Sequence, residues 1–302
     1  MKKHNFNAGP SILADEVIQN AAKAIVDFNG SGLSLLSISH RTKDFENVMA
    51  EADALFRELL GIPDNYKIFY IGGGASTFFY EVPANFLGRK AGYVNTGVWA
   101  KKAIKEAKRY GEVELLASSE DRNFTYIPKG FAIPADLDYV HICENNTIYG
   151  TKYKELPECG NVPLVADCSS CILSEPMEIS RYGLIFAGAQ KNMGIAGLTV
   201  VIVREDLIQE RPEIPSMLSY AVQAKNKSMF NTPPTFAIYL LGLVLEWIER
   251  QGGLEAIEAR NERKAKLLYD YLDSSTFYQA AAQKQDRSLM NVTFRTPSKE
   301  LD

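Results

Sequence analysis

Two short apolar runs constrain the fold of this chain most strongly, because each ends in a polar side chain of a particular kind. Residues 163–166 (PLVA) lead into Asp167, and residues 184–189 (LIFAGA) lead into Gln190 and Lys191. Apolar runs of this length, bounded by turn residues, are typical of strands buried on both faces of a parallel sheet. Open α/β sheets bind ligands at the carboxyl ends of their strands. We therefore expect Asp167 and Lys191 to meet at one ligand-binding edge.

An aspartate and a lysine at neighbouring strand ends suggest pyridoxal phosphate chemistry. A lysine placed there is costly unless it has a partner or a covalent task. Lysine can hold the aldehyde of pyridoxal phosphate as a Schiff base, while aspartate keeps the pyridine nitrogen protonated. The glycine-containing segment 192–197 (NMGIAG) favours this interpretation, since small residues let the backbone approach a flat cofactor. The alternative is an exposed lysine in a turn and an aspartate that caps the next helix.

The preceding half of the chain alternates between strand and helix patterns. Predicted strands cover residues 66–71, 92–96, 113–116 and 139–143. Predicted helices cover residues 15–28, with Asp15 as the cap, residues 43–60, which Gly61 ends, and residues 99–110. This alternation is typical of a doubly wound α/β fold with a mostly parallel sheet flanked by helices.

Three of these strand ends supply further candidate ligand contacts. Residues 72–77 (GGGAST) join a strand to a helix, and the free N–H groups of such a turn suit a phosphate. Glycines needed only for their dihedral angles are the alternative, and the segment matches neither the GxGxxG nor the Walker pattern. Trp99 offers either a stacking face for a planar cofactor or a core side chain. Thr147 follows the strand at 139–143 and is expected on the same rim.

The remaining third of the chain predicts long helices and a smaller domain. We expect a loop region from Val203 to Ser228, and then a helix that has Pro234 at its first position and ends near Arg250. A second helix (254–272), a strand (289–294) and a helix start at 296–298 are predicted to follow. We expect a large cofactor-binding domain at 12–257. The N-terminal arm 1–11 and residues 258–302 are expected to form a small α/β domain. Because the last predicted helix has barely begun where the sequence stops, we expect the small domain to be incomplete.

Charge and cysteine content exclude several classes of protein. The formal net charge of −4 argues against nucleic acid as the main partner. The first residues lack the apolar region of a signal peptide, and the apolar run 236–245 is too short to span a bilayer, so we expect a cytoplasmic protein without membrane contact. Four cysteines are too few for a disulfide scaffold. Cys168 and Cys171 have a redox or half-zinc spacing, but we expect buried thiols and no metal, because the sequence has no second pair.

Short motifs along almost the whole chain, in the expected order, resemble the phosphoserine aminotransferase family, in the class V branch of the fold-type I pyridoxal phosphate enzymes. The matching stretches are FNAGP (6–10), ISHR (38–41), GGGAS (72–76), NTGVW (95–99), ENNTIYG (144–150), ADCSS (166–170), GAQKN (188–192) and NTPP (231–234).

The resemblance implies roles for individual residues. Lys191 would carry the Schiff base, Asp167 would contact the pyridine nitrogen, Trp99 would stack on the ring and Thr147 would lie at its phenolic side. The phosphate would be held by Ala75, Ser76 and Gln190, joined by Asn231 and Thr232 from the second subunit of a homodimer. Arg41, helped by His40, would bind a substrate acid group. The family also has a His–Arg pair and a further arginine near its C-terminus, which this sequence does not reach, so catalysis by this chain is in question.

The implied reaction transfers the amino group of L-glutamate to 3-phosphohydroxypyruvate and yields O-phospho-L-serine and 2-oxoglutarate. It serves serine biosynthesis, and the phosphohydroxythreonine step of vitamin B6 biosynthesis is a related use. The alternatives are another class V aminotransferase of the alanine or serine–glyoxylate type, a cysteine desulfurase, or a pyridoxal phosphate-binding dimer without turnover. Gln190 argues against the desulfurase, in which a histidine precedes the lysine.

Overall fold

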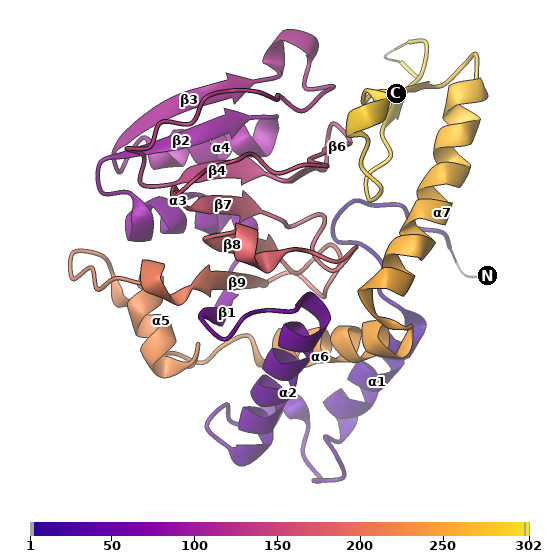
Figure 1. The fold of residues 1–302 in the computed structure, drawn as a ribbon. Coiled ribbons are helices and arrows are strands. Elements are labelled where there is room, and N and C mark those ends of the chain that lie inside the picture. The colour runs from indigo at the N-terminus through magenta and orange to yellow at the C-terminus, as the bar shows by residue number, and fades with distance from the viewer. Residues whose placement is uncertain (1–2, 299, 302) are drawn as a thin grey trace.

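The computed structural model describes residues 3–298 and 300–301 and is organised around one seven-stranded sheet. Its strand order is β1-β9-β8-β7-β4-β2-β3 (Figure 1). The strands are β1 (Tyr66–Gly72), β2 (Lys90–Asn95), β3 (Glu112–Ser118), β4 (Val140–Cys143), β7 (Leu164–Asp167), β8 (Leu184–Gly188) and β9 (Leu198–Arg204). From β3 to β8 all neighbours pair in parallel, whereas β9 runs antiparallel to both β8 and β1. The prediction of a mostly parallel sheet is confirmed.

The strands that lead to Asp167 and Lys191, β7 and β8, lie at the centre of the sheet. Every residue of β7 and of β8 is buried. Alternate side chains enter different cores: Ala166 and Ile185 join one apolar cluster, and Val165 and Phe186 join the other. This alternation follows from the two-residue repeat of a strand. Because both faces of these strands pack against apolar side chains, near-continuous apolar runs are required.

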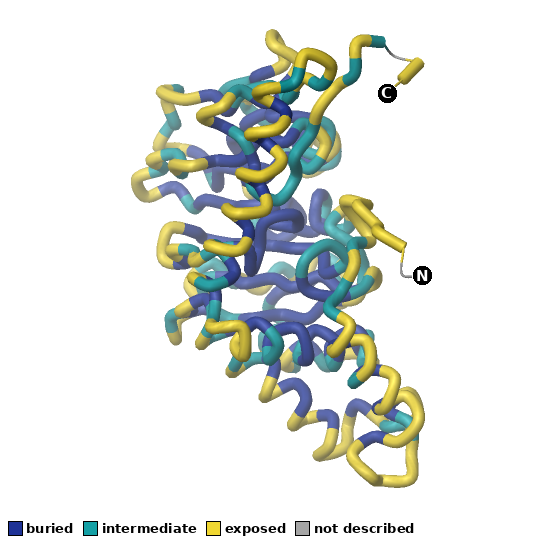
Figure 2. The backbone as a smooth tube through the Cα atoms, turned by 90° about the vertical axis from the view of Figure 1, so that its right-hand side faces the viewer, coloured by how far each residue is buried: buried dark blue, intermediate teal, exposed yellow. Residues whose placement is uncertain are grey.

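Helices from different parts of the chain cover the sheet. α3 (Ala75–Phe86) and α4 (Val98–Ala107) pack on one face, where Phe78 and Ala103 join the core of β2 and β8. α1 (Asp15–Val26), α2 (Lys43–Leu60) and α6 (Thr235–Arg250) form a group beside the β1 edge (Figure 1). Figure 2 shows that the buried backbone is continuous through the sheet and that exposed residues dominate at the far end of this helical group.

The C-terminal part lies beside the carboxyl ends of the central strands. α7 (Gly253–Ser274) runs up one side of the molecule (Figure 1). Beyond it, β10 (Gln279–Ala280) and β11 (Phe294–Arg295) form a short antiparallel pair, with a small apolar cluster around Tyr269 and Leu272. A second short pair, β5 (Asn145–Asn146) and β6 (Thr151–Lys152), forms the loop that follows β4.

Several predicted boundaries hold, and α2 matches its prediction at both ends. Gly61 ends this helix in the left-handed conformation at φ 58°, which glycine adopts without a steric penalty. Asp15 is the first helical residue of α1 and not its cap, which is Ala14. Likewise, Pro234 is the N-cap of α6 and does not occupy its first helical position.

Three predictions for the second half of the chain are wrong. The expected loop at 203–228 contains α5 (Tyr220–Asn226), whose N-terminus is capped by the Ser219 hydroxyl accepting from the Val222 amide at 3.4 Å. The expected strand at 289–294 pairs only at its end, because residues 288–293 bind the loop after β4 instead. Residues 296–298 are not helical, and Lys299 lies outside the described residues. Among the described helices, none is both long and apolar enough to cross a membrane.

Candidate active site

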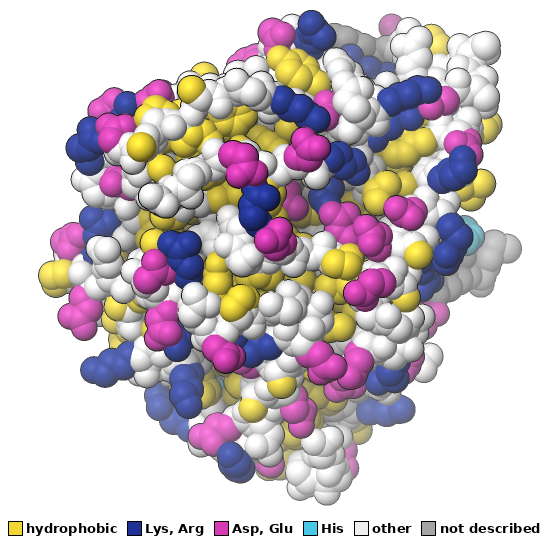
Figure 3. All heavy atoms as spheres, in the orientation of Figure 1, with side chains coloured by type: hydrophobic (Ala, Val, Ile, Leu, Met, Phe, Trp, Pro, Cys, Tyr) yellow, Lys and Arg dark blue, Asp and Glu magenta, His cyan; other side chains and the backbone are white. Residues whose placement is uncertain are grey.

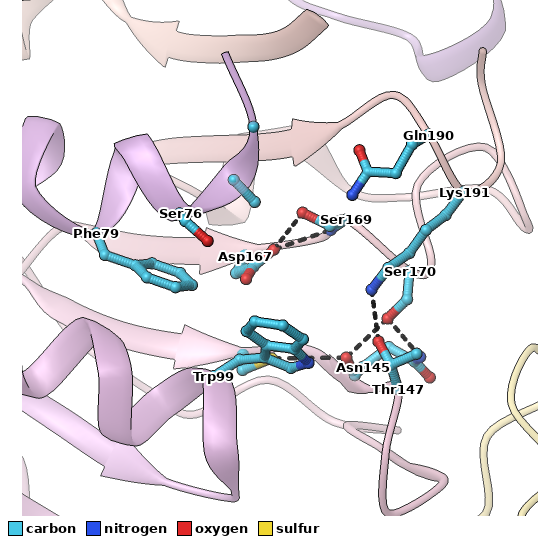
Figure 4. Close-up of a pocket in the computed structure, with 13 residues that line it drawn as sticks. Ser76, Phe79, Trp99, Asn145, Thr147, Asp167, Ser169, Ser170, Gln190 and Lys191 are labelled. Atoms are coloured by element: carbon cyan, nitrogen blue, oxygen red, sulfur yellow. Dashed lines mark hydrogen bonds between the residues drawn. The ribbon is translucent and has the colours of Figure 1, made fainter. Parts of the chain in front are cut away.

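A cavity opens at the carboxyl ends of the central strands (Figure 4). Its lining comes from α3 and the residue before it, from α4, from the ends of β4 and β7, and from the segments after β4, β7 and β8. The lining residues are Gly74, Ala75, Ser76, Phe79, Trp99, Cys143, Asn145, Thr147, Asp167, Ser169, Ser170, Gln190 and Lys191. The structure thus brings Asp167 and Lys191 to one cavity, together with Ala75, Ser76, Trp99, Thr147 and Gln190.

Asp167 is the last residue of β7, and its carboxylate is held by one neighbour. The Ser169 backbone N–H and hydroxyl both donate to Asp167 Oδ1, at 3.0 and 2.6 Å. The Ser169 oxygen in turn accepts from the Gly188 amide at 3.0 Å, which ties the group to β8. Burial raises the pKa of Asp167, while the Ser169 hydrogen bonds and the charge of Lys191 oppose this rise. Because these bonds end on Oδ1, Oδ2 is available to a ligand.

Lys191 follows β8 and extends across the cavity. Its Nζ donates to the Thr147 hydroxyl at 2.6 Å and lies 6.0 Å from the centre of the Trp99 ring. The N-terminal arm packs against the same residue: a Cβ on Gly9 would come within 3.0 Å of Lys191 Cγ. The Ser11 amide also donates to the Gln190 carbonyl at 3.0 Å. The arm therefore fixes the backbone from which the lysine projects.

Trp99 stands in the first turn of α4 and forms one wall of the cavity. Gly97 precedes this helix at φ 149°, and a Cβ there would lie 2.7 Å from the Tyr149 ring, so the turn requires glycine. Lys102, one turn further on, places its Nζ 4.5 Å from the centre of the indole ring. The buried Nε1 of Trp99 has no hydrogen-bond partner within the described part of the chain. In Figure 4 the Trp99 indole borders the same space that the Asp167 carboxylate faces.

The N-terminus of α3 forms the opposite end of the cavity. Its N-cap residue, Gly74, offers no side chain to the first amides of the helix. Gly73 is held at φ 130°, with its amide donating to the Gly197 carbonyl at 3.0 Å. Ala75 and Ser76 therefore present free N–H groups and a hydroxyl at the positive end of a helix dipole, an arrangement that favours an anion. The Gln190 carboxamide lies so close to the backbone that a Cβ on Gly188 would be 2.6 Å from its Oε1.

These groups fit pyridoxal phosphate. The cofactor needs an amine for its aldehyde, a carboxylate for its ring nitrogen, a flat apolar face and an anion site for its phosphate. Lys191, Asp167, Trp99 and the uncapped α3 N-terminus supply these groups around one cavity.

Four of the residues singled out in the sequence do not line this cavity. Arg41 is exposed in the loop before α2, and its neighbour His40 is buried, with an Nε2 that has no hydrogen-bond partner among the described residues. Asn231 and Thr232 are exposed in the segment that leads to α6. Their positions do not bring them to the Lys191 of the same chain.

Several residues of the cavity wall have no role predicted from the sequence, among them Phe79, Asn145, Ser169 and Ser170. Ser169 and Ser170 directly follow Asp167, and Asn145 lies two residues before Thr147. This nearness in the sequence to predicted site residues is the one feature that could have pointed to them. The expectation of buried thiols at 168 and 171 is confirmed. Cys168 donates to Glu144 Oε2 at 3.2 Å, and burial raises the pKa of its thiol, which makes it a poor nucleophile.

Comparison with known proteins agrees with this geometry. The family described as "Aminotransferase class-V" matches residues 3–301. A phosphoserine aminotransferase of Bacteroides thetaiotaomicron is 56% identical over 97% of this chain and 83% of its own length. That of Listeria monocytogenes is 53% identical over 99% of this chain and 83% of its own length.

The solved structures that this chain resembles include phosphoserine aminotransferases as well. The phosphoserine aminotransferase of Bacillus circulans subsp. alkalophilus superposes with a TM-score of 0.96 at 48% identity, over 98% of this chain and 84% of that one. The pyridoxal phosphate-bound enzyme of Trichomonas vaginalis reaches a TM-score of 0.93 at 37% identity, over the same shares. An alanine–glyoxylate aminotransferase from Nostoc shares the fold, with a TM-score of 0.75 at 15% identity over 99% of this chain and 82% of that one.

Proposed function

The chain belongs to the class-V aminotransferase family, and we propose that it acts as a phosphoserine aminotransferase that uses pyridoxal phosphate. The observation that carries this proposal is the meeting of the Lys191 amine and the Asp167 carboxylate in one cavity. The substrates are L-glutamate and 3-phosphohydroxypyruvate, and the products are 2-oxoglutarate and O-phospho-L-serine.

Each wall of the cavity has a task in this reaction. Pyridoxal phosphate, when bound, supplies an electron sink for the negative charge that develops at the substrate Cα. Lys191 would hold the cofactor through its amine, and its Nζ would move a proton to and from the substrate Cα. Asp167, whose Oδ1 is occupied by Ser169, offers Oδ2 to keep a proton on the ring nitrogen. The Thr147 hydroxyl, 2.6 Å from Lys191 Nζ, orients the amine.

The remaining contacts orient the cofactor and anchor its anion. Trp99 would offer its indole as an apolar face to the ring and would exclude water there. The first amides of α3, at Ala75 and Ser76, bind the phosphate together with the Gln190 carboxamide. With both ends of the cofactor held, the lysine works from a fixed position relative to the substrate.

We propose a homodimer with shared active sites, because four candidate residues lie outside the cavity of their own chain. Asn231 and Thr232 are exposed and would complete the phosphate site of a second copy. Arg41, helped by His40, would bind the acid group of the substrate in that copy. Apolar side chains exposed on and after α1 support an interface there: Ile18, Ile25, Val26, Leu33 and Leu36.

The other expected partners are small acidic molecules. On the face drawn in Figure 3, Lys and Arg side chains alternate with Asp and Glu and form no continuous basic stripe, which favours small substrates over nucleic acid. Buried free thiols suit a reducing cytoplasm. We also propose the division into a large domain (12–257) and a small domain (258–302 with the arm 1–11), and a role in vitamin B6 synthesis beside serine synthesis.

An acceptor assay tests the proposed function. The protein is loaded with pyridoxal phosphate and glutamate, and the formation of 2-oxoglutarate is measured with 3-phosphohydroxypyruvate or glyoxylate as acceptor. We expect turnover with the phosphorylated acceptor and little with glyoxylate. Preference for glyoxylate would identify a different class V aminotransferase. A protein whose cofactor absorbance does not bleach with glutamate would be a cofactor-binding dimer without turnover.

A further inference from the structure

Residues 288–293, which follow α7 in the C-terminal part, hold the loop that carries Thr147 into the cavity. The Ser288 amide donates to the Gly150 carbonyl at 2.8 Å, and the Thr293 hydroxyl donates to the Tyr149 carbonyl at 3.0 Å. On the other side of Thr147, Asn291 Oδ1 accepts from Asn145 Nδ2 at 2.7 Å. Thr147 thus lies between two anchors that come from the same segment.

Asn145 connects this segment to the cavity wall. Its Nδ2 also donates to the Ser170 hydroxyl at 2.7 Å, and its Oδ1 accepts from the Ser288 hydroxyl at 2.5 Å. The Asn145 side chain is buried, so losing any of these partners leaves a polar atom without compensation. Asn145 and Ser170 both line the cavity, whereas Ser288 and Asn291 do not.

The loop and the segment pack closely against each other at Gly150. Gly150 has φ +71°, and a Cβ on it would lie 2.5 Å from the Thr293 hydroxyl and 2.8 Å from the Asn291 carbonyl. Two surfaces packed this closely move together, because protein interiors have almost no void to absorb a displacement. A shift of residues 288–293 is therefore transmitted to the loop and to Thr147.

We propose that Asn291 and Thr293 are positioning residues of the active site. From the C-terminal part of the chain they fix the loop 145–150, so that the Thr147 hydroxyl meets the Lys191 amine at 2.6 Å. They act through the loop and touch neither the cofactor cavity nor Lys191 itself. The inference rests on the proposed function, since it assigns these residues to the geometry of the same lysine.

The test compares variants that differ by one hydrogen bond. Thr293→Val removes the hydroxyl and keeps the shape, while Thr293→Ser keeps the hydroxyl. Asn291→Ala is matched by Gln285→Ala, which removes a carboxamide from an exposed position nearby. Each protein is loaded with pyridoxal phosphate, and the absorbance of the bound cofactor is followed as the pH is varied. Thermal unfolding establishes that each variant is folded, and kcat and KM for glutamate are measured in parallel.

We expect the pH midpoint of the absorbance change to shift by about 0.5–1 pH unit in Thr293→Val and Asn291→Ala, because one hydrogen bond has been lost. In both variants kcat should fall by about five- to tenfold with a smaller change in KM. Thr293→Ser and Gln285→Ala should behave as the wild type does.

Unchanged midpoints in folded Thr293→Val and Asn291→Ala would overturn the inference, and so would equal shifts in the two control variants. If Asn291→Ala does not fold, the Thr293→Val and Thr293→Ser pair decides alone. A wild-type protein that binds no pyridoxal phosphate would overturn the proposed function, and this inference with it. A wild type that turns over normally beside unaffected variants would overturn the inference alone.

Discussion

At the scale of single residues, the Asp167 carboxylate has one oxygen held by hydrogen bonds and the other oxygen open to a ligand. Ser169 holds Asp167 Oδ1 with two hydrogen bonds and is itself held by the Gly188 amide. A buried carboxylate with only one oxygen engaged presents the other to whatever enters the cavity. Asp167 was predictable from the sequence, because it ends an apolar run. The pattern says nothing of Ser169, since a serine after a strand is equally common in an ordinary turn.

Replacing Ser169 by alanine should therefore weaken catalysis without preventing cofactor binding. The hydroxyl that donates to Asp167 and accepts from Gly188 is lost, while the backbone N–H bond remains. A hydrogen bond from a neutral hydroxyl to a charged group contributes about 1.5–3 kcal/mol. We therefore expect kcat to fall by roughly tenfold to a hundredfold. Steady-state kinetics with glutamate measures this. A matched Ser180→Ala change, at an exposed 3₁₀ turn, should leave kcat unchanged.

At the scale of elements, α3 contributes both the proposed phosphate site and a buried acid. Its N-terminus faces the cavity, while Glu81 in its middle is fully buried and neither carboxylate oxygen has a partner among the described residues. The helix itself was predictable from the glycine turn that precedes it. The burial of Glu81 was not, because the sequence does not show that the Tyr220 helix, α5, covers this side. The prediction of a loop at 203–228 was wrong for a related reason, because α5 is short and depends on a contact with a distant segment. Asn85 of α3 helps to fix the start of α5 by accepting from the Tyr220 amide at 3.0 Å.

Glu81 should make the stability of the fold depend on pH. Burial raises the pKa of Glu81 from 4.5 to about 8. The folded state therefore keeps a proton that the unfolded chain releases, so the contribution is full below pH 4.5 and is lost as the pH rises towards 8. Between pH 6 and 8 the wild type should lose on the order of 2 kcal/mol of unfolding free energy relative to Glu81→Gln, which carries no titrating group there. Urea unfolding of both proteins at the two pH values tests this, and parallel pH curves would refute it.

At the scale of the whole molecule, the candidate substrate-binding residue Arg41 lies outside the cavity of its own chain. The central sheet and the long helices α2, α6 and α7 were predictable, because apolar periodicity is strong over long or fully buried elements. The position of residues 288–293 was not predictable, because they bond to a loop far away in the sequence. Nor does the sequence pattern by itself show that Arg41, Asn231 and Thr232 lie outside the cavity of their own chain.

A mixing experiment tests the shared sites. Lys191→Ala should abolish activity, and a double Asn231→Ala, Thr232→Ala variant should lose most of it through weaker phosphate binding. If Asn231 and Thr232 bind the phosphate in the cavity of the partner subunit, a dimer with one subunit of each variant contains one intact site. That site has Lys191 from one subunit and Asn231 and Thr232 from the other. Unfolding and refolding an equal mixture should then restore roughly a quarter of the wild-type activity, since half of the dimers are hybrids with one working site. Mixtures as inactive as their parents would contradict shared sites.

We propose above all that Lys191 is the residue that holds the cofactor opposite Asp167. The most direct measurement is to load the protein with pyridoxal phosphate, reduce it with borohydride, digest it and locate the added mass by mass spectrometry. We expect the phosphopyridoxyl group on Lys191, with modification of that site lost in Lys191→Ala. Its appearance on another lysine at equal yield, for example on Lys102 beside the Trp99 ring, or on none, would contradict it.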